Sequence, residues 1–189
     1  QDILGMLRLA LILFGIAAVV ALLLSAVNEV TKDPIARQKE AAVNSAMSQV
    51  LPADSYQLVE NIAELGLDEI VLEVYAAKNG EEQIGYCVKT APLGFGGAIE
   101  LITGVDMNGN VTRVNIVSMS ETAGLGTKTK DSAFLDQYSG KSIDVAVTTG
   151  SNPKENEVSA ISGATVSSKA VTAGVAAAVS AVNAIKGAA

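Results

Sequence analysis

Residues 162–185 read SGATVSSKAVTAGVAAAVSAVNAI, a short segment of hydroxyl residues and glycine that runs directly into a helical pattern. In this pattern aliphatic residues recur at helical spacing: Val171, Val175, Val179, Val182 and Ile185. Such a stripe is typical of a helix that packs on a sheet. The uncharged run Ala170–Ile185 is too short and too rich in alanine to favour a membrane span. We therefore predict a core helix over residues 167–185.

The sheet that this helix would cover is predicted from stretches upstream of it. The first stretch has apolar residues at alternate positions, on one face of a strand: Ile70, Leu72, Val74 and Ala76. The turn signal Asn79-Gly80 would return the chain into a partner strand over Ile84–Thr90. These strands would form an antiparallel hairpin.

A second hairpin and a further strand are expected later in the chain. The hairpin would join Ile99–Met107 to Val111–Val117 around Asn108-Gly109-Asn110, and a short strand would follow over Ile143–Thr149. Before the sheet, Ala36–Val50 has the pattern of an amphipathic helix. The predicted fold class is α+β, with a mostly antiparallel sheet flanked by helices.

The amino-terminal part of the chain is strongly apolar. No charged residue occurs from Leu9 to Asn28, and about 20 apolar residues can cross a bilayer as a helix. A secretory signal peptide has a shorter apolar region of about 7–15 residues. A buried core helix rarely lacks a polar stripe over this length. We therefore expect one transmembrane anchor in residues 1–30 and one globular domain in residues 31–189.

The orientation of this anchor is less strongly encoded. Arg8 precedes the apolar run, whereas Lys32 and Arg37 follow it, so basic residues lie on both sides. A large domain crosses the membrane largely regardless of its charge. We expect a single-pass protein of the cell membrane whose globular domain lies on the extracytoplasmic side.

Composition excludes several classes of function. The chain has 189 residues and a formal net charge of −7, which argues against a nucleic-acid partner. Histidine is absent, so a Ser-His-Asp triad and histidine-ligated metal or haem are excluded. The single cysteine, Cys87, is expected to be a core thiol and cannot hold an iron–sulfur cluster alone. We predict no catalytic residue and no metal site, so redox chemistry would need an organic cofactor.

The segment Ser162–Ser168 is a candidate phosphate site. A helix start offers unpaired backbone N–H groups and a partial positive charge, and both favour an anion. Gly163 permits close approach of the backbone, hydroxyl groups surround it, and Lys169 adds a cation. The segment lacks the Gly-Lys-Ser/Thr ending of a P-loop. An ordinary helix cap remains the other interpretation.

The same segment, Ser162-Gly163-Ala164-Thr165-Val166-Ser167-Ser168, resembles the flavinylation motif of the FMN-binding domains in RnfG, which is the G subunit of the Rnf electron transport complex, and in NqrC. Two further glycine-bearing stretches occur in the family's order: Gly94-Phe95-Gly96-Gly97, and Glu121-Thr122-x-Gly124-Leu125-Gly126. The resemblance covers nearly the whole chain. It implies an FMN joined through its phosphate to the hydroxyl of Thr165 by a flavin transferase.

The resemblance also implies which residues surround this cofactor. Around the acceptor it implies contacts from Ser162, Gly163, Ala164, Ser168 and Lys169. A second loop would lie close to the flavin ring, with contacts from Glu121, Thr122, Gly124, Leu125 and Gly126. For Glu121, a solvated surface charge is the other interpretation.

Three positions depart from the family pattern. Ala123 stands where proline is usual, Met119 where histidine is frequent, and Ser159 where many members carry an acidic residue. None of these changes removes the acceptor hydroxyl.

The implied function is electron transfer through covalent FMN in an ion-translocating ferredoxin:NAD⁺ oxidoreductase complex. Its partners would be other membrane and iron–sulfur subunits of an Rnf complex. The chain has no dinucleotide fingerprint, and its apolar run has no carboxylate for ion transport. One alternative is an NqrC-type subunit of the Na⁺-translocating NADH:quinone reductase, although such proteins are generally longer. Another is a non-redox anchored module in which residues 162–165 only cap a helix.

Overall fold

The structure, a computed structural model, describes residues 2–60, 62–142, 145–150 and 153–188. The chain divides into two compact units, Gln1–Ala42 and Val43–Ala189. Helix α1 spans Asp2–Val50, so it supplies the first unit and also the first residues of the second.

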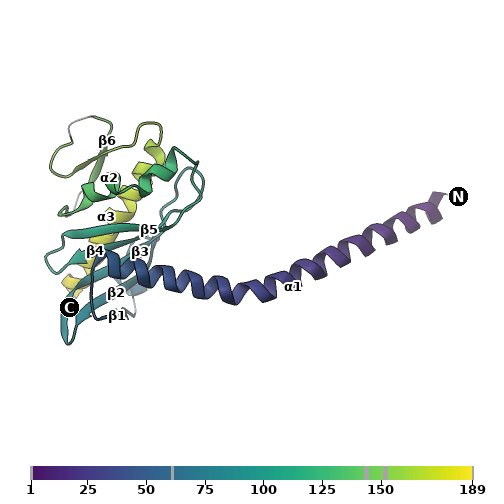
Figure 1. Cartoon of the computed structure of the whole chain (residues 1–189), viewed down its shortest axis with the longest axis horizontal. Helices are drawn as coiled ribbons and strands as arrows, with labels where there is room; N and C mark the ends of the chain where they lie inside the picture. Colours follow the sequence, from purple (N-terminus) through teal and green to yellow (C-terminus); the bar gives the residue numbers. More distant parts are fainter. Residues whose placement is uncertain (1, 61, 143–144, 151–152, 189) are drawn as a thin grey trace. The chain divides into compact units, whose positions relative to one another are not determined.

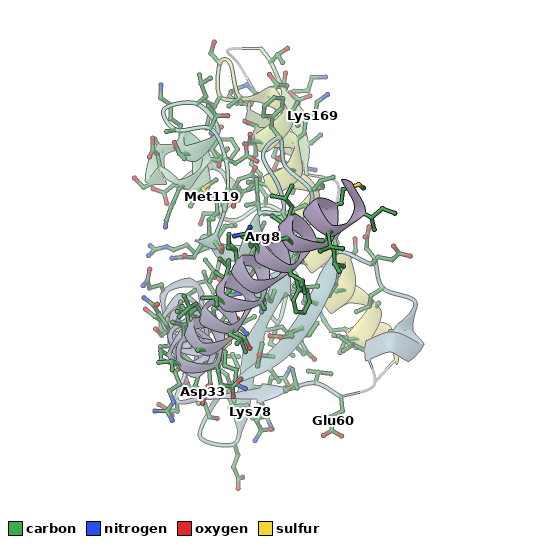
Figure 2. The ribbon with its side chains drawn as sticks, turned by 90° about the vertical axis from the view of Figure 1, so that its right-hand side faces the viewer. Arg8, Asp33, Glu60, Lys78, Met119 and Lys169 are labelled. Atoms are coloured by element: carbon green, nitrogen blue, oxygen red, sulfur yellow. The ribbon has the colours of Figure 1, made fainter. Side chains whose placement is uncertain are left out.

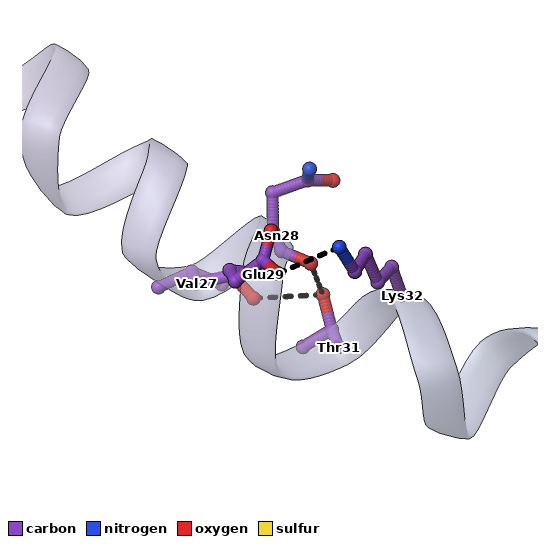
Figure 3. Close-up of polar contacts among 5 residues, drawn as sticks. All are labelled: Val27, Asn28, Glu29, Thr31 and Lys32. Carbon is purple, nitrogen blue, oxygen red and sulfur yellow. Dashed lines mark hydrogen bonds and ion pairs between the residues drawn. The ribbon is translucent and has the colours of Figure 1, made fainter.

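In the first unit, the apolar side chains of α1 between Arg8 and Glu29 are exposed, except that of Ala18, which is half-buried (Figure 2). Polar contacts begin where this stretch ends (Figure 3). The Thr31 hydroxyl donates to the carbonyl oxygens of Val27, at 2.9 Å, and Asn28, at 3.4 Å. Lys32 Nζ pairs with Glu29 Oε1 at 2.6 Å. The apolar surface of this helix is therefore the surface that a lipid environment would cover.

The residues predicted to form the amphipathic helix Ala36–Val50 are helical, but they do not begin a new element. Helix α1 continues through them from the apolar stretch, with Pro34 inside it. Proline removes one intrahelical hydrogen bond, and here the residues on both sides stay helical.

In the second unit the strands form a five-stranded antiparallel sheet in the order β1-β2-β3-β4-β5 (Figure 1). Their bounds are β1 Ser55–Leu58, β2 Val71–Asn79, β3 Glu82–Thr90, β4 Glu100–Asp106 and β5 Val111–Ser118. Both predicted hairpins, β2–β3 and β4–β5, are confirmed. The α+β class is confirmed with them.

The predicted face of β2 is wrong at one residue. Val74 and Ala76 are buried as expected, but Leu72 is 45% exposed. The pairing of β2 with β3 shifts register between Val71 and Glu73. A bulge at this point turns the side chain of Leu72 out of the alternation.

Helix α3 (Thr165–Ala188) packs against one face of the sheet through the predicted stripe (Figure 1). Val171, Val175, Val179 and Val182 are fully buried there. The opposite face is covered by the end of α1, where Met47 and Val50 pack with Cys87 and Ile102. The sheet is therefore flanked by helices, and Cys87 is a core thiol as predicted.

Among the residues that the structure describes, two helices are long and apolar enough to cross a membrane. For the segment Ile3–Val50, none of the most apolar window is buried, whereas for Thr165–Gly187 56% of it is buried. Burial against the sheet accounts for the second helix, which agrees with the prediction of a core helix.

The connection between β5 and α3 consists of short elements. They are η2 Gly126–Lys130, α2 Ser132–Leu135, η3 Asp136–Tyr138, β6 Ala146–Thr148 and β7 Glu157–Ser159. Earlier in the chain, one further short helix, η1 (Ile62–Leu65), lies between β1 and β2. Strand β6 lies within the predicted range Ile143–Thr149, whose residues 143–144 are outside the described residues. β6 pairs in parallel with β7, which the sequence did not predict because each has only three residues.

Candidate functional site

A cavity of about 360 Å³ lies at the start of α3. Three segments that are distant in sequence line it: Phe95; the loop residues Glu121, Thr122, Leu125 and Gly126; and Gly163, Ala164, Thr165, Val166 and Ser167. The structure thus places the two segments that the sequence singled out on one cavity.

The start of α3 presents free backbone donors to this cavity. Helix α3 begins at Thr165, two residues before the predicted start, and its first backbone hydrogen bond runs from the Ser168 N–H to the Ala164 carbonyl at 2.9 Å. Within the described part of the chain, the N–H groups of Thr165, Val166 and Ser167 have no partner. Gly163, at φ 78°, adopts a left-handed conformation that favours glycine at the turn into the helix. These donors suit a phosphate ester.

The hydroxyl groups of the segment differ in availability. The Ser168 hydroxyl is buried; it donates to the Ala164 carbonyl at 2.9 Å and accepts from the Ile161 N–H at 3.0 Å. The Ser167 hydroxyl is buried and donates to Glu121 Oε2 at 2.6 Å. Thr165 is half-buried at the cavity, and its hydroxyl has no partner among the described residues.

Glu121 is fixed in the wall of the cavity. Its Oε1 accepts from the Gly96 N–H at 3.1 Å, while its Oε2 accepts from Ser167. The residue is half-buried, so its carboxylate is not a freely solvated surface charge. It connects the loop after β5 with both the glycine-rich turn and α3.

The loop that follows Glu121 uses several of its own backbone groups. The Leu125 N–H donates to the Thr122 carbonyl at 3.2 Å, and the Gly124 N–H donates to the Thr127 hydroxyl at 2.9 Å. These two amides are therefore not available to a ligand, although the resemblance implies contacts from both Gly124 and Leu125. The Thr122 hydroxyl has no partner in the described residues. Leu125 is 45% exposed at the cavity.

Some predicted site residues lie away from the cavity lining. Ser162, Gly124, Ser168 and Lys169 do not line it. Ser168 is buried beneath the start of the helix, and Lys169 is exposed on α3 (Figure 2). Phe95 and Val166 do line it and were not implied as cofactor contacts, whereas Ser167, which also lines it, belongs to the candidate phosphate segment Ser162–Ser168. All three stand inside the glycine-bearing motifs, so the sequence carried a signal for them.

The residues at the three departures from the family pattern have other environments. Met119 packs against the core, and Ala123 is exposed. The Ser159 N–H donates to Gln137 Oε1 at 2.9 Å, and its hydroxyl donates to the Gly150 carbonyl at 3.4 Å. Among the residues described, no group of three His, Cys, Asp or Glu side chains could hold a metal ion.

The lining fits a flavin nucleotide by its chemistry. The free N–H groups at the start of α3 suit the phosphate, and three large apolar side chains suit an aromatic ring. Phe95 is 74%, Val166 53% and Leu125 45% exposed. The lining therefore combines free backbone donors at the helix start with exposed apolar side chains.

Comparison with known proteins identifies the family. Residues 94–180 match the FMN-binding domain, and residues 5–50 match the RnfG N-terminal region. A relative from Acetobacterium woodii, the G subunit of its Na(+)-translocating ferredoxin:NAD(+) oxidoreductase complex, is 39% identical, with 89% of this chain and 87% of the relative covered. The G subunit of the Proton-translocating ferredoxin:NAD(+) oxidoreductase complex of Clostridium ljungdahlii is 33% identical, with 82% of this chain and 79% of the relative covered.

A solved structure, the C subunit of the Na(+)-translocating NADH-quinone reductase from Parabacteroides distasonis, is 24% identical to this chain. The matched region includes 58% of this chain and 59% of the solved chain, with a TM-score of 0.49, which is too low to distinguish between families. The identity to the two ferredoxin:NAD(+) oxidoreductase relatives over most of both chains is decisive, and the chain belongs to the RnfG family, the G subunits of Rnf complexes, which carry an FMN-binding domain.

Proposed function

We propose that this chain is the membrane-anchored subunit that relays electrons through a covalently bound FMN in an ion-translocating ferredoxin:NAD⁺ oxidoreductase complex. The relatives in this family are named as subunits of such complexes, and the match to the FMN-binding domain indicates that the cofactor is FMN. The observation that carries the proposal is the free hydroxyl of Thr165 at the start of α3.

We take Thr165 as the acceptor because, among the described hydroxyl residues of the motif, it lines the cavity with a hydroxyl that has no partner, whereas Ser162 is exposed outside the lining. Ser167 and Ser168 are buried, and each has a hydrogen-bond partner. Thr165 lines the cavity, and no hydrogen bond described for its hydroxyl has to break. In the step that the transferase would catalyse, Oγ1 bonds to the phosphorus of a flavin nucleotide donor, the bond from that phosphorus to the donor's leaving group breaks, and the hydroxyl proton is released with the leaving group. The phosphate oxygens would then lie beside the N–H groups of Thr165, Val166 and Ser167, which stabilise negative charge.

In this proposal the protein residues bind and orient the flavin, and the flavin carries out the redox chemistry. FMN, when bound, accepts and donates electrons. The helix start holds its phosphate, and Leu125 and Val166 give the ring an apolar contact. A covalent bond keeps the cofactor from dissociating, so the flavin stays at a high local concentration beside its partners. Those partners would be other membrane and iron–sulfur subunits of the complex.

The anchor proposed in residues 1–30 would hold the domain at the membrane. Its exposed apolar stretch, free of charge from Leu9 to Asn28, has the length of a membrane span. We place the FMN domain on the extracytoplasmic side. A fusion of alkaline phosphatase to the carboxy terminus should then be active, and a cytoplasmic reporter fused there should be silent; the reverse result would contradict this placement.

Covalent attachment is tested by fluorescence of the denatured protein. The chain is coexpressed with a flavin transferase and run on a denaturing gel. The wild-type band should fluoresce, and its mass should exceed that of the chain by one FMN less one water. Thr165→Ala should be dark, and Thr165→Ser should retain fluorescence because it keeps a hydroxyl.

The matched control is Ser180→Ala, which removes an exposed hydroxyl of the same helix outside the motif and the cavity lining. Its band should be as bright as the wild type. A dark wild-type band beside an active transferase, or a fluorescent Thr165→Ala band, would contradict the proposed attachment. A wild-type chain that binds no flavin at all would favour the helix-cap interpretation.

A further inference from the structure

The glycine-rich turn between β3 and β4 brings a large aromatic side chain to the cavity. Leu93 and Ala98 form an isolated antiparallel bridge, and the Gly94 N–H donates to the Gly97 carbonyl at 2.8 Å, which closes the turn. Phe95 stands inside this turn, 74% exposed, and it lines the cavity. An aromatic ring this exposed leaves its face available for contact with another flat ring.

Glu121 fixes this turn to the start of α3. One carboxylate oxygen accepts from the Gly96 N–H at 3.1 Å, and the other accepts from the Ser167 hydroxyl at 2.6 Å. Hydrogen bonds to a charged acceptor are stronger than those between neutral groups. Because Ser167 lies two residues after Thr165, one side chain sets the spacing between the turn that carries Phe95 and the helix that carries the acceptor.

The glycines around Glu121 make this arrangement tight. A Cβ at Gly94 would meet Glu121 Oε1, and a Cβ at Gly126 would meet Glu121 Oε2 and also lie 2.9 Å from the Ser167 hydroxyl. A Cβ at Gly96 would meet the Ser120 carbonyl oxygen. The backbone of two glycine-bearing segments therefore encloses the carboxylate, which leaves it little freedom to move.

We propose that the turn Leu93–Ala98 is the third segment of the flavin site, that Phe95 contacts the isoalloxazine ring, and that Glu121 is a positioning residue which holds this turn in place. This inference rests on the proposed function, since it concerns how the ring of the FMN is held. It gives Glu121 a role through Gly96 and Ser167 rather than through direct contact with the ring.

The test separates attachment of the flavin from contact with its ring. Full-length protein in detergent, flavinylated by coexpressed transferase, is measured twice. Fluorescence after denaturation gives the amount of covalent flavin. In the native protein, iodide quenching and fluorescence anisotropy are then measured and normalised to the amount of flavin. They report how far the isoalloxazine ring is shielded from solvent and restricted in motion. Phe95→Ala should leave the amount of covalent flavin unchanged. It should raise the ratio of rings released from the cavity to rings bound in it by about two- to tenfold, as expected for loss of an aromatic contact.

Variants of Glu121 distinguish positioning from charge. Glu121→Ala loses both hydrogen bonds, so its native flavin should become as accessible to iodide as in Phe95→Ala. Glu121→Gln can accept from the Gly96 N–H with its oxygen and donate to Ser167 with its amide, so it should stay close to the wild type. The matched control is Leu58→Ala, which truncates an exposed apolar residue of β1 outside both the turn and the cavity lining and should not change either measurement.

The two proposals fail in different ways. A dark denatured wild-type band overturns the covalent attachment. A fluorescent band with wild-type iodide quenching in Phe95→Ala overturns the ring contact, and wild-type quenching in Glu121→Ala overturns the positioning role. If the wild-type band is dark, anisotropy titrations with free FMN replace the native measurement, and equal affinities of wild type and Phe95→Ala overturn the ring contact there as well. Because Phe95 is exposed, its truncation should not affect folding.

Discussion

The phenol of Tyr138 lies 2.7 Å from the hydroxyl of Thr172, and both side chains are buried between η3 and α3. The Thr172 hydroxyl also lies 3.0 Å from the Ser168 carbonyl and donates to it, so Tyr138 is the donor to Thr172. Burial raises the pKa of Tyr138, which keeps its proton in place. This chain of hydrogen bonds ends one turn below Thr165 and fixes the start of α3.

Removal of either partner should destabilise the domain, but by different amounts. Tyr138→Phe loses one hydrogen bond and leaves Thr172 bonded to Ser168, so we expect a loss of about 1 kcal/mol in the free energy of unfolding. Thr172→Val leaves the Tyr138 hydroxyl buried without a partner, which should cost about 2 kcal/mol. Urea titrations of the detergent-solubilised chain, followed by circular dichroism, measure both.

The double variant Tyr138→Phe/Thr172→Val provides the control. It leaves no unpaired phenol, so its loss should be smaller than the sum of the two single losses. Additive losses, or a larger loss for Tyr138→Phe than for Thr172→Val, would show that this pair does not act as the distance indicates.

Gly174→Ala should destabilise the domain even though alanine is the better helix former. A Cβ at Gly174 would lie 2.8 Å from Thr90 Oγ1 and 3.0 Å from side-chain carbons of Leu101 and Pro92. Overpacking costs roughly 1–3 kcal/mol and exceeds the gain in helix propensity of about 1 kcal/mol. We expect a net loss of about 1 kcal/mol in the free energy of unfolding by urea titration.

Gly187 of the same helix is the matched control, because a Cβ there would meet nothing within 4 Å. Gly187→Ala should therefore be neutral or slightly stabilising. If both substitutions change stability equally, close packing of α3 on the sheet is not the reason for glycine at position 174.

Much of the fold could be predicted because its signals are local. The Asn79-Gly80 turn and the Asn108-Gly109-Asn110 turn specify both hairpins, and the valine stripe specifies how α3 packs. The bulge that exposes Leu72 was missed because it depends on pairing with β3. Likewise, nothing local marks the parallel pairing of β6 with β7.

The site was predicted in part for a similar reason. The hydroxyl and glycine pattern at residues 162–168 is local, and it singles out the helix start. The contacts of Glu121 join residues 25 and 46 positions apart, to Gly96 and Ser167 respectively, so only the folded chain brings them together. The sequence pattern predicts a place for Glu121 beside the ring but not the partners that hold it.

Thr103→Val should stabilise the domain, in contrast to Thr172→Val. The hydroxyl of Thr103 is fully buried on the sheet and has no partner among the described residues, whereas that of Thr172 is bonded. Removing a buried hydroxyl without a partner should raise the free energy of unfolding by about 1 kcal/mol. Urea titration measures the change, and a loss of stability in Thr103→Val would indicate a hydrogen bond to an ordered water.

Stability should fall at alkaline pH because of the core thiol. Burial raises the pKa of Cys87 from 9.0 to about 12, so the folded state keeps a proton that the unfolded state releases. The stabilisation is complete below about pH 9 and is lost as the pH rises toward about 12, by about 1.4 kcal/mol per pH unit. Urea titrations with reductant, at about pH 8 and about pH 10.5, should differ by about 2 kcal/mol more in wild type than in Cys87→Ala. The comparison uses the pH dependence of each protein, because the cavity left by alanine lowers stability at both values. Equal pH dependence in the two proteins would mean that Cys87 ionises in the folded domain as readily as in the unfolded chain.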